Sequence, residues 1–219
     1  MNNSKIHKKP VIVGLLGGLG SGKTATAQIF KAYGFAIFDA DATVHELLDT
    51  KQIQDQIKNT FGHSVINMHT NKIDKKKLAQ IVFSCKGALK KLTDILHPLV
   101  IKRFEEFLQD AVDKFRGIVL DAPLLLEAGM DRFCTHLIFI DTPLQQRIKR
   151  ASKRGITEQE LLKRESFQLP LSEKRQRADL VIDNSADLAS LRVQVKEFIS
   201  KIVSDGTFNG GTYGKKRGN

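Results

Sequence analysis

Short apolar runs alternate with longer amphipathic stretches along most of the chain. Between the runs, apolar side chains recur every three or four residues, the spacing of a helix that buries one face. Strands that alternate with helices in this way form a parallel sheet covered on both faces, so the pattern predicts an α/β fold. The expected strands are 11–16, 35–38, 117–120, 136–140 and 180–182.

The longest interval between strand-like runs spans about eighty residues and contains no good strand. Phe61-Gly62 interrupts two helical stretches there, and two further apolar stripes follow at helical spacing. Such stripes are typical of a helical core rather than of a cofactor-binding segment. We therefore expect a helical insertion at about residues 41–115, over the carboxyl end of the sheet. Its stripes comprise Leu78, Ile81, Val82, Leu89, Leu92, Ile95 and Leu96.

Length and composition are those of one globular domain. The chain has 219 residues, 41% of them hydrophobic, enough for a single core at about residues 11–204 that includes the insertion. No apolar run approaches the roughly 18 residues of a membrane span, so no membrane association is expected. Segments 1–10 and 205–219 are expected to be flexible tails, the second because it is rich in glycine and basic residues.

The first residues look only superficially like a secretion signal. Three lysines precede the apolar run 11–16, but cleavage after this run would destroy the glycine-rich loop that follows. Cys85 and Cys134 form no CxxC pair and are too few for a disulfide framework. The default expectation is a cytoplasmic protein.

The most informative motif follows the first strand directly. Residues 17–24 read Gly-Gly-Leu-Gly-Ser-Gly-Lys-Thr, the G-x-x-x-x-G-K-T pattern of a phosphate-binding loop between strand and helix. Glycines let backbone N–H groups turn toward an anion, Lys23 can reach the β- and γ-phosphates of ATP, and the Thr24 hydroxyl can bind Mg²⁺. A plain glycine-rich turn does not account for the order of strand, loop and helix. The expected ATP-binding residues are Gly18, Leu19, Gly20, Ser21, Gly22, Lys23, Thr24 and Ala25.

Aspartates follow the second, third and fourth strands. Ligands of open parallel sheets bind beyond the carboxyl ends of the strands, so these side chains should line one crevice. Asp39 and Asp41, two residues apart in an extended segment, are expected to point to the same side. One can accept the proton of an attacking hydroxyl while the other orients it or holds water on Mg²⁺; the alternative is that Asp41 only caps the next helix. Asp121 is expected near Mg²⁺, and Asp141, which Thr-Pro follows, is expected to cap a helix.

The net charge of +11 is unevenly distributed. Residues 144–178 hold ten basic and four acidic side chains. We expect them to form a lid beside the crevice, in which an arginine neutralises a transferring phosphoryl group and closure excludes water. Arg154, next to the hinge-like Gly155, is the preferred candidate, with Arg147 or Arg150 as alternatives. A nucleic-acid-binding patch is the competing interpretation, although the segment lacks interleaved aromatic residues.

Two further motifs have a structural and a functional interpretation. His97-Pro98 is expected to open a helix, since proline suits the first helical position, which places His97 at an exposed N-terminus that favours anions. A capping or packing histidine is the equal alternative. Residues 71–74 spell the N-K-x-D of guanine-specific GTPases, but they lie in polar surroundings before the third strand and are interpreted as a turn and helix cap.

Taken together, these motifs resemble those of the dephospho-CoA kinase family, from about residue 11 to residue 203. The phosphate loop alone indicates only a superfamily, whereas the ordered set of Asp-Ala-Asp, His-Pro and Asp-x-Pro-Leu-Leu-x-Glu is far more specific. The matching stretches are 17–24, 39–41, 96–98, 121–127, 168–174 and 178–185.

The resemblance implies transfer of the ATP γ-phosphate to the ribose 3′-hydroxyl of dephospho-CoA, the last step of coenzyme A synthesis. It also implies a three-layer P-loop kinase fold with a five-stranded parallel sheet, a helical acceptor-binding insertion and a lid. On this resemblance Asp41 is the base, while Lys23 and Arg154 stabilise the transferring phosphoryl group. Mg²⁺ is bound by Thr24, with Asp121 acting through water. The implied acceptor-binding residues are Asp39, Asp41, His97 and Asp121.

ATP and dephospho-CoA are thus the expected partners, with no specific nucleic acid, and we expect a monomer or a weak homo-oligomer. Two alternatives remain open at the level of sequence. One is another small-molecule kinase of the same superfamily, such as a nucleoside or nucleotide kinase. The other is an ATPase stimulated by nucleic acid, which the positive charge would favour.

Overall fold

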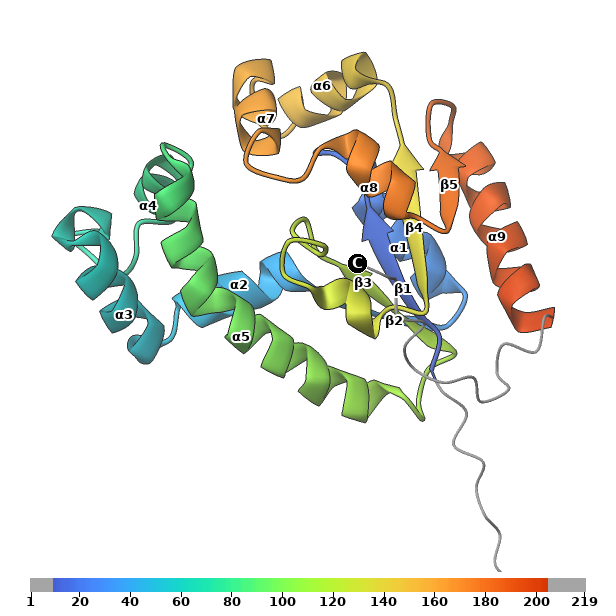
Figure 1. Cartoon of the computed structure of the whole chain (residues 1–219), viewed down its shortest axis with the longest axis horizontal. Helices are drawn as coiled ribbons and strands as arrows, with labels where there is room; N and C mark the ends of the chain where they lie inside the picture. Colours follow the sequence, from blue (N-terminus) through green and yellow to red (C-terminus); the bar gives the residue numbers. More distant parts are fainter. Residues whose placement is uncertain (1–9, 205–219) are drawn as a thin grey trace, which may run out of the picture.

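The computed structural model describes residues 10–204, so the predicted tails, apart from Pro10, lie outside the described residues. Five strands form one parallel sheet in the order β2-β3-β1-β4-β5, as Figure 1 shows. The inner strand β1 is buried along its whole length, as expected for a sheet covered on both faces. The predicted α/β class and five-stranded parallel sheet are confirmed. The strands are β1 (Ile12–Leu16), β2 (Phe35–Asp39), β3 (Gly117–Asp121), β4 (His136–Asp141) and β5 (Leu180–Asp183).

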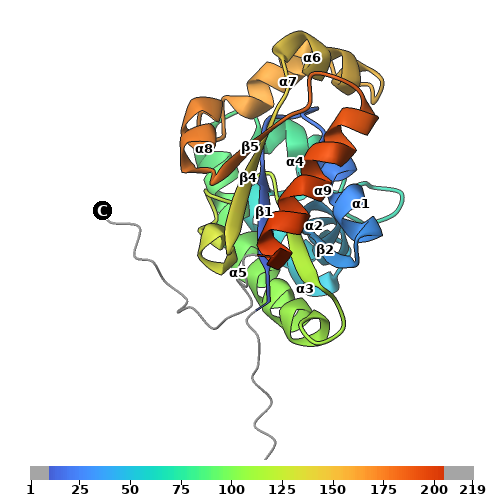
Figure 2. The ribbon, with the colours of Figure 1, turned by 90° about the vertical axis from the view of Figure 1, so that its right-hand side faces the viewer.

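Two helices cover one face of the sheet. They are α1 (Lys23–Ala32), which follows the phosphate loop, and α9 (Leu188–Ser204), and both lie in front of the strands in Figure 2. Phe30 of α1 is fully buried, and its ring packs edge-on against Phe35 at 5.1 Å and Phe198 at 6.1 Å. This apolar layer holds α1, and with it the loop that precedes α1, against the sheet.

The other face is covered mainly by a long helix, α5 (Lys86–Ala111), which crosses below the sheet in Figure 1. Phe104 of α5 is fully buried and packs edge-on against Phe38 of β2 at 5.1 Å and against Phe133 at 5.2 Å. Because Phe38 immediately precedes Asp39, this contact fixes the strand end at which the predicted acidic residues lie.

Between β2 and β3, helices joined by turns make up the chain, with one isolated bridge between Ile66 and Ile73. The helices extend to one side of the sheet in Figure 1, away from α9. The first long helix ends at Phe61 because Gly62 has a φ of 80°, as the Phe-Gly break predicts. The elements are α2 (Ala40–Leu48), α3 (Lys51–Phe61), η1 (His63–Val65), α4 (Lys75–Val82) and α5.

The predicted turn and cap at residues 71–74 are confirmed. Asn71 has a positive φ of 53°, which a tight turn accommodates. The Asp74 carboxylate caps α4 by accepting hydrogen bonds from the backbone N–H groups of Lys76 and Lys77, both at 3.1 Å. The N-K-x-D letters therefore arise from local structure and not from a guanine site.

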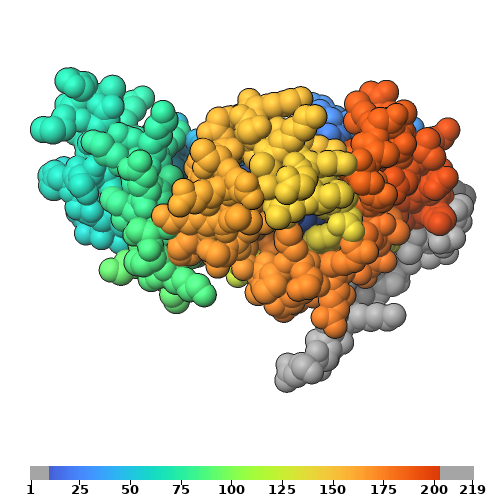
Figure 3. Space-filling model, turned by 90° about the horizontal axis from the view of Figure 1, so that it is seen from above, coloured from blue at the N-terminus to red at the C-terminus, as the bar shows by residue number. Residues whose placement is uncertain are grey.

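A cluster of short helices lies between the insertion and α9. Seen from above in Figure 3, this yellow and orange segment covers the middle of the molecule. Its elements are α6 (Leu144–Ser152), α7 (Glu158–Glu165) and α8 (Leu171–Arg177). The short helix η2 (Met130–Phe133) lies apart from them, on the side of the sheet where Phe133 packs against Phe104 of α5. Within residues 10–204, no helix is both long enough and apolar enough to cross a membrane.

The prediction that Pro98 opens a helix is wrong. α5 continues through this position, so His97 lies in mid-helix. Proline removes one backbone donor, but the buried side chains of Leu96 and Val100 pack on either side and hold the helix together. His97 therefore has no helix N-terminus with which to attract an anion.

The prediction that Asp141 caps a helix is also wrong. Pro143 occupies the N-cap of α6, which receives no side-chain cap. Asp141 instead ends β4 and forms an ion pair with Arg175 of α8. Two residues separate Asp141 from the first residue of α6. The Asp141 carboxylate is therefore too far along the chain from the first N–H groups of α6 to cap them.

Candidate active site

The backbone of the loop 17–24 is shaped to receive an anion. Gly17, Gly20 and Gly22 have φ values of 143°, 76° and 100°. A Cβ atom at Gly20 would in addition lie 2.6 Å from the carbonyl oxygen of Arg147, so only glycine fits there. The loop leads into α1, whose N-terminal N–H groups and dipole favour phosphate.

Lys23 is the first residue of α1, and its ammonium turns back onto the loop. Its Nζ donates hydrogen bonds to the carbonyl oxygens of Gly17 at 2.9 Å and Gly18 at 3.1 Å. Burial lowers the pKa of Lys23, and the negative charge of Asp121 partly opposes this shift. The ammonium is thus held by backbone dipoles rather than by a carboxylate, which leaves its charge for an arriving phosphate.

Asp121 lies beside the loop at the end of β3. It is the register partner of Asp39 on the neighbouring strand. Its Oδ2 is 3.5 Å from the Thr24 hydroxyl, a distance at which Thr24 donates only a weak hydrogen bond. Burial raises the pKa of Asp121, while the nearby Lys23 ammonium acts in the opposite direction. Thr24 and Asp121 therefore place a hydroxyl and a carboxylate oxygen side by side at the start of α1.

Asp39 and Asp41 do not lie in the extended segment that their spacing suggested. The helix α2 begins at Ala40, because the Asp39 carboxylate accepts a hydrogen bond from Ala42 N at 2.9 Å and so caps it. Asp41 therefore lies in the first turn of α2, and the alternative in which Asp41 is the cap is wrong. Both carboxylates still line the same cavity.

The environment of Asp41 raises the pKa of its carboxyl group. Its carboxylate is solvent-accessible at the cavity mouth, yet the surrounding protein reduces its hydration, and this burial raises its pKa. The Asp39 charge raises the pKa of Asp41 further, whereas the Lys23 ammonium lowers it. A carboxylate whose proton affinity is increased in this way is better suited to accept a proton from a hydroxyl.

A cavity of about 490 Å³, here called the phosphate-loop cavity, brings these groups together. Its floor is formed by six of the eight predicted ATP-binding residues. Gly18 lies instead at a separate cavity of about 150 Å³, and Ser21 is buried. The six are Leu19, Gly20, Gly22, Lys23, Thr24 and Ala25; the acidic wall consists of Asp39, Asp41 and Asp121.

The three candidate arginines have different surroundings. Arg147 is buried and forms an ion pair with Glu165 of α7; their side chains are 7% and 14% exposed. Arg154 is exposed, lines the phosphate-loop cavity, and makes no ion pair or side-chain hydrogen bond within residues 10–204. Of Arg147 and Arg154, Arg154 thus has the freer guanidinium and the better access to the cavity.

Arg150 contacts the back of the loop. Its guanidinium donates hydrogen bonds to the carbonyl oxygens of Ser21 at 3.3 Å and Asn184 at 3.0 Å. The Asn184 side chain in turn donates to the same Ser21 carbonyl at 2.7 Å. These contacts brace the loop from the side of β5, and Arg150 and Asn184 form the wall opposite the acidic residues.

His97 does not line the phosphate-loop cavity among the described residues. Burial lowers its pKa, while the carboxylates of Asp94 and Glu127 act in the opposite direction. His97 therefore lies near Asp94 and Glu127 and outside the lining of the phosphate-loop cavity.

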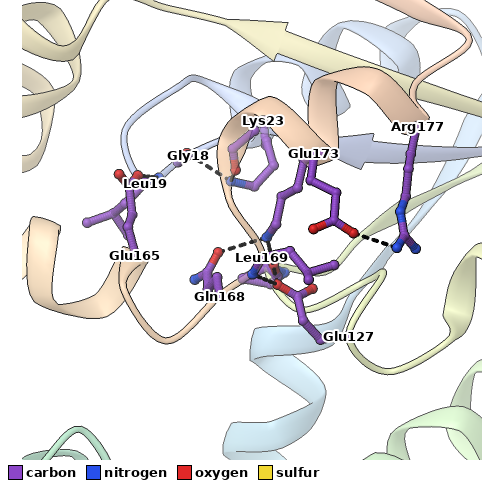
Figure 4. Close-up of polar contacts among 12 residues, drawn as sticks. Gly18, Leu19, Lys23, Glu127, Glu165, Gln168, Leu169, Glu173 and Arg177 are labelled. Atoms are coloured by element: carbon purple, nitrogen blue, oxygen red, sulfur yellow. Dashed lines mark hydrogen bonds and ion pairs between the residues drawn. The ribbon is translucent and has the colours of Figure 1, made fainter.

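Three charged residues near the cavity had no role in the sequence prediction. Arg164 of α7 lies close enough to Asp41 for its charge to lower the pKa of that carboxyl. Glu165 accepts a hydrogen bond from Leu19 N at 2.8 Å, beside the loop in Figure 4. Lys174 of α8 is 1% exposed. Their contacts with the cavity, the loop and the chain after β3 join segments that are distant in sequence, so no local pattern reveals these contacts.

The donor atoms near the loop fit a magnesium ion. Mg²⁺ binds hydroxyl, carboxylate and phosphate oxygens and retains several waters, so it needs few protein ligands. Thr24 Oγ1 and Asp121 Oδ2, 3.5 Å apart, supply two such oxygens. Within residues 10–204, no group of three or more His, Cys, Asp or Glu side chains is placed to hold a metal on its own. The chain thus offers part of a site that a bound phosphate would complete.

Comparison with known proteins gives a consistent set of relatives. The model of the dephospho-CoA kinase family matches residues 11–190. A dephospho-CoA kinase of Fusobacterium nucleatum is 35% identical over 193 residues, which cover 88% of this chain and 98% of that protein. The crystal structure of TT1252 from Thermus thermophilus superposes with a TM-score of 0.75 at 30% identity, covering 89% and 99% of the two chains. A dephospho-CoA kinase from Campylobacter jejuni has a TM-score of 0.63 at 26% identity, covering 89% and 98%.

Proposed function

The chain belongs to the dephospho-CoA kinase family, and we infer that its phosphate-loop cavity is where the γ-phosphoryl group of ATP passes to the ribose 3′-hydroxyl of dephospho-CoA. The protein is an ATP-dependent kinase of the last step of coenzyme A biosynthesis. The observation that carries the assignment of the site is the convergence of Lys23 with three aspartates in one cavity.

ATP binds along the loop in this proposal. The backbone N–H groups of residues 18–25 surround its phosphates, and Lys23 moves from the carbonyls of Gly17 and Gly18 to the β- and γ-phosphates. Thr24, and Asp121 through water, would hold Mg²⁺, which would supply positive charge to the phosphates. Support comes from the positive φ of the loop glycines and from the Lys23 ammonium, which makes no ion pair with a carboxylate within residues 10–204.

The acceptor hydroxyl approaches from the acidic side of the cavity. Asp41 accepts its proton as the oxygen attacks the γ-phosphorus, and Asp39 and Asp121 orient the ribose. The raised pKa of Asp41 supports this choice, because it increases the driving force for proton transfer. His97, on the neighbouring helix α5, contacts a more distant part of dephospho-CoA.

We assign two subdomains to this reaction within a kinase domain at about residues 11–204. The insertion at about 41–115 binds the acceptor, because α2 begins at the acidic wall of the cavity. The segment at about 144–178, which includes α6 to α8, is the lid, and its Arg154 stabilises the transferring phosphoryl group while closure excludes water. The enzyme acts in the cytoplasm as a monomer or weak homo-oligomer.

An acceptor assay tests this function. Purified full-length protein is incubated with Mg-ATP and one of three acceptors, dephospho-CoA, adenosine or AMP, and the products are separated by chromatography. We expect coenzyme A and an equal amount of ADP from dephospho-CoA, and no comparable product from the other two. Turnover of adenosine or AMP without turnover of dephospho-CoA would contradict the proposal, as would ATP hydrolysis that only DNA or RNA stimulates.

A further inference from the structure

Lys174 is a fully enclosed cation with a complete set of partners. Its side chain is 2% exposed, and its Nζ lies 3.0 Å from Glu127 Oε1. The same Nζ donates to the carbonyl oxygen of Pro123 at 3.0 Å and to Gln168 Oε1 at 2.9 Å. An ammonium has three protons to donate, so these three acceptors satisfy it.

Glu127 joins the cation to a further segment. Its Oε1, which pairs with Lys174, also accepts a hydrogen bond from Leu169 N at 2.8 Å, as Figure 4 shows from the side of α8. Its Oε2 is buried and has no hydrogen-bond partner within the described residues. One carboxylate oxygen therefore holds both the middle of α8, which carries Lys174, and the chain that enters α8.

The five residues of this network connect two segments that flank the phosphate-loop cavity. The first follows β3: Pro123, whose carbonyl accepts from Lys174, lines the cavity and lies two residues after Asp121. The second follows α7: Gln168 lies three residues after Glu165, which accepts a hydrogen bond from Leu19 N in the phosphate loop. The network thus joins an acidic wall of the cavity to the end of the lid.

Stability alone does not account for such a pair. Replacing a buried ion pair with apolar side chains of similar volume is often neutral or stabilising, because both charges lose their hydration. A site that must hold two segments at a fixed position relative to each other gains more from the directed hydrogen bonds of an ammonium and a carboxylate than from apolar contacts. The pair also lies near the reacting groups, since the Lys174 charge contributes to the lowered pKa of Lys23.

We propose that Lys174 and Glu127 are positioning residues for phosphoryl transfer. They fix the chain after β3 and the end of the lid relative to each other, so that the closed lid admits the acceptor hydroxyl and excludes water. The inference rests on the proposed function of the cavity. In the coupled reaction the ribose oxygen attacks the γ-phosphorus and ADP leaves; in the uncoupled reaction a water oxygen attacks instead, giving ADP and inorganic phosphate.

The test measures the ratio of ADP to coenzyme A formed by the full-length enzyme with Mg-ATP and dephospho-CoA. The variants are Lys174→Met, Glu127→Gln and the double variant Lys174→Met/Glu127→Met, which leaves no uncompensated charge buried. Glu173→Gln is the matched control, because Glu173 is on the same helix α8 and pairs with Arg177 nearer the surface, as Figure 4 also shows. Thermal unfolding of each variant is recorded in parallel.

We expect both single variants to lower kcat by about tenfold to a hundredfold, because a small misplacement of the reacting groups slows the transfer by about this factor. The KM for ATP should change little. The ADP to coenzyme A ratio should rise above one in them and stay near one in Glu173→Gln. The double variant should recover thermal stability but not the ratio.

Two results would overturn the inference. One is a ratio near one in all folded variants, with activity lost only in proportion to unfolded protein. The other is a double variant with wild-type kcat and ratio, which would show that the pair matters only as a charge balance. If the single variants do not fold, the double variant decides between these outcomes. Failure of the wild-type enzyme to phosphorylate dephospho-CoA would instead contradict the function proposed for the cavity.

Discussion

Charged side chains at the carboxyl edge of the sheet differ in their partners from charged side chains under helices α6 to α8. In the phosphate-loop cavity, Lys23 bonds two backbone carbonyls, and Asp41 faces a second carboxylate that raises its pKa. Beneath α6 to α8, Arg147 pairs with Glu165 and Lys174 pairs with Glu127. The first set has charges without a direct ion-pair partner within residues 10–204, whereas each charge of the second set is paired with an opposite one.

This difference distinguishes groups that act on substrates from groups that hold the framework. A charge without an ion-pair partner in a cavity lowers the free energy of unfolding and is available to a ligand of opposite charge. A balanced buried pair has no net charge to offer a ligand, but removal of one partner leaves the other charge buried and unpaired. Substitutions in the two regions should therefore separate activity from stability.

The largest expected effect is on catalysis, from Lys23→Met. Removing this ammonium should lower kcat/KM for ATP by about a hundredfold to a thousandfold or more, as expected for loss of a charge that stabilises the transferring phosphoryl group. The free energy of unfolding should not fall, because a cation whose pKa burial has lowered is replaced by an apolar chain of similar length. Steady-state kinetics and urea unfolding measure the two quantities. A large loss of stability would remove the distinction between the two regions.

The next effect is on stability, from Arg147→Met. The Glu165 carboxylate would remain buried without its partner, so we expect a loss of about 3 kcal/mol or more in the free energy of unfolding, measured by urea denaturation. Lys90→Met is the control: Lys90 pairs with Asp94 on the surface of α5, where the side chains are 74% and 59% exposed. In Lys90→Met, the loss in the free energy of unfolding should stay below about 1 kcal/mol. Equal losses in the two variants would contradict the role assigned to the Arg147 pair.

The smallest effect is a shift in a pH profile, from Asp39→Asn. Asp41 must be deprotonated to accept a proton, and burial and Asp39 raise its pKa above 3.8, so kcat/KM should fall as the pH drops through that raised value. Asparagine also caps helices well, so α2 should remain intact. Removing the Asp39 charge lowers the pKa of Asp41, and the acid limb should move to lower pH. An unchanged or upward shift would show that another group controls this limb.

The sequence predicted the sheet and the loop because both depend on neighbouring residues. Apolar runs bounded by turn residues located each strand, and the spacing of glycines before Lys23 located the loop. The Phe61-Gly62 break was also local, since a glycine at positive φ ends the helix. Features of this kind need no knowledge of the tertiary structure.

The remaining features depended on contacts between distant segments. Arg147 and Glu165 are 18 residues apart, and Lys174 and Pro123 are 51 residues apart. Pro98 was mistaken for a helix start because the packing that keeps α5 continuous is tertiary. The start of α2 at Ala40 could have been found from Asp39, which is a good N-cap residue, but two aspartates separated by one residue left the cap ambiguous.

The central claim is that the charged residues of the phosphate-loop cavity catalyse phosphoryl transfer, with Asp41 as the base. A single-turnover experiment with Asp41→Asn tests it most directly: enzyme in excess over labelled ATP is mixed with dephospho-CoA and quenched at short times, and ATP binding is titrated separately. We predict nearly unchanged ATP affinity and a rate of coenzyme A formation about a hundredfold lower or more. A transfer rate close to that of the wild-type enzyme would contradict the claim.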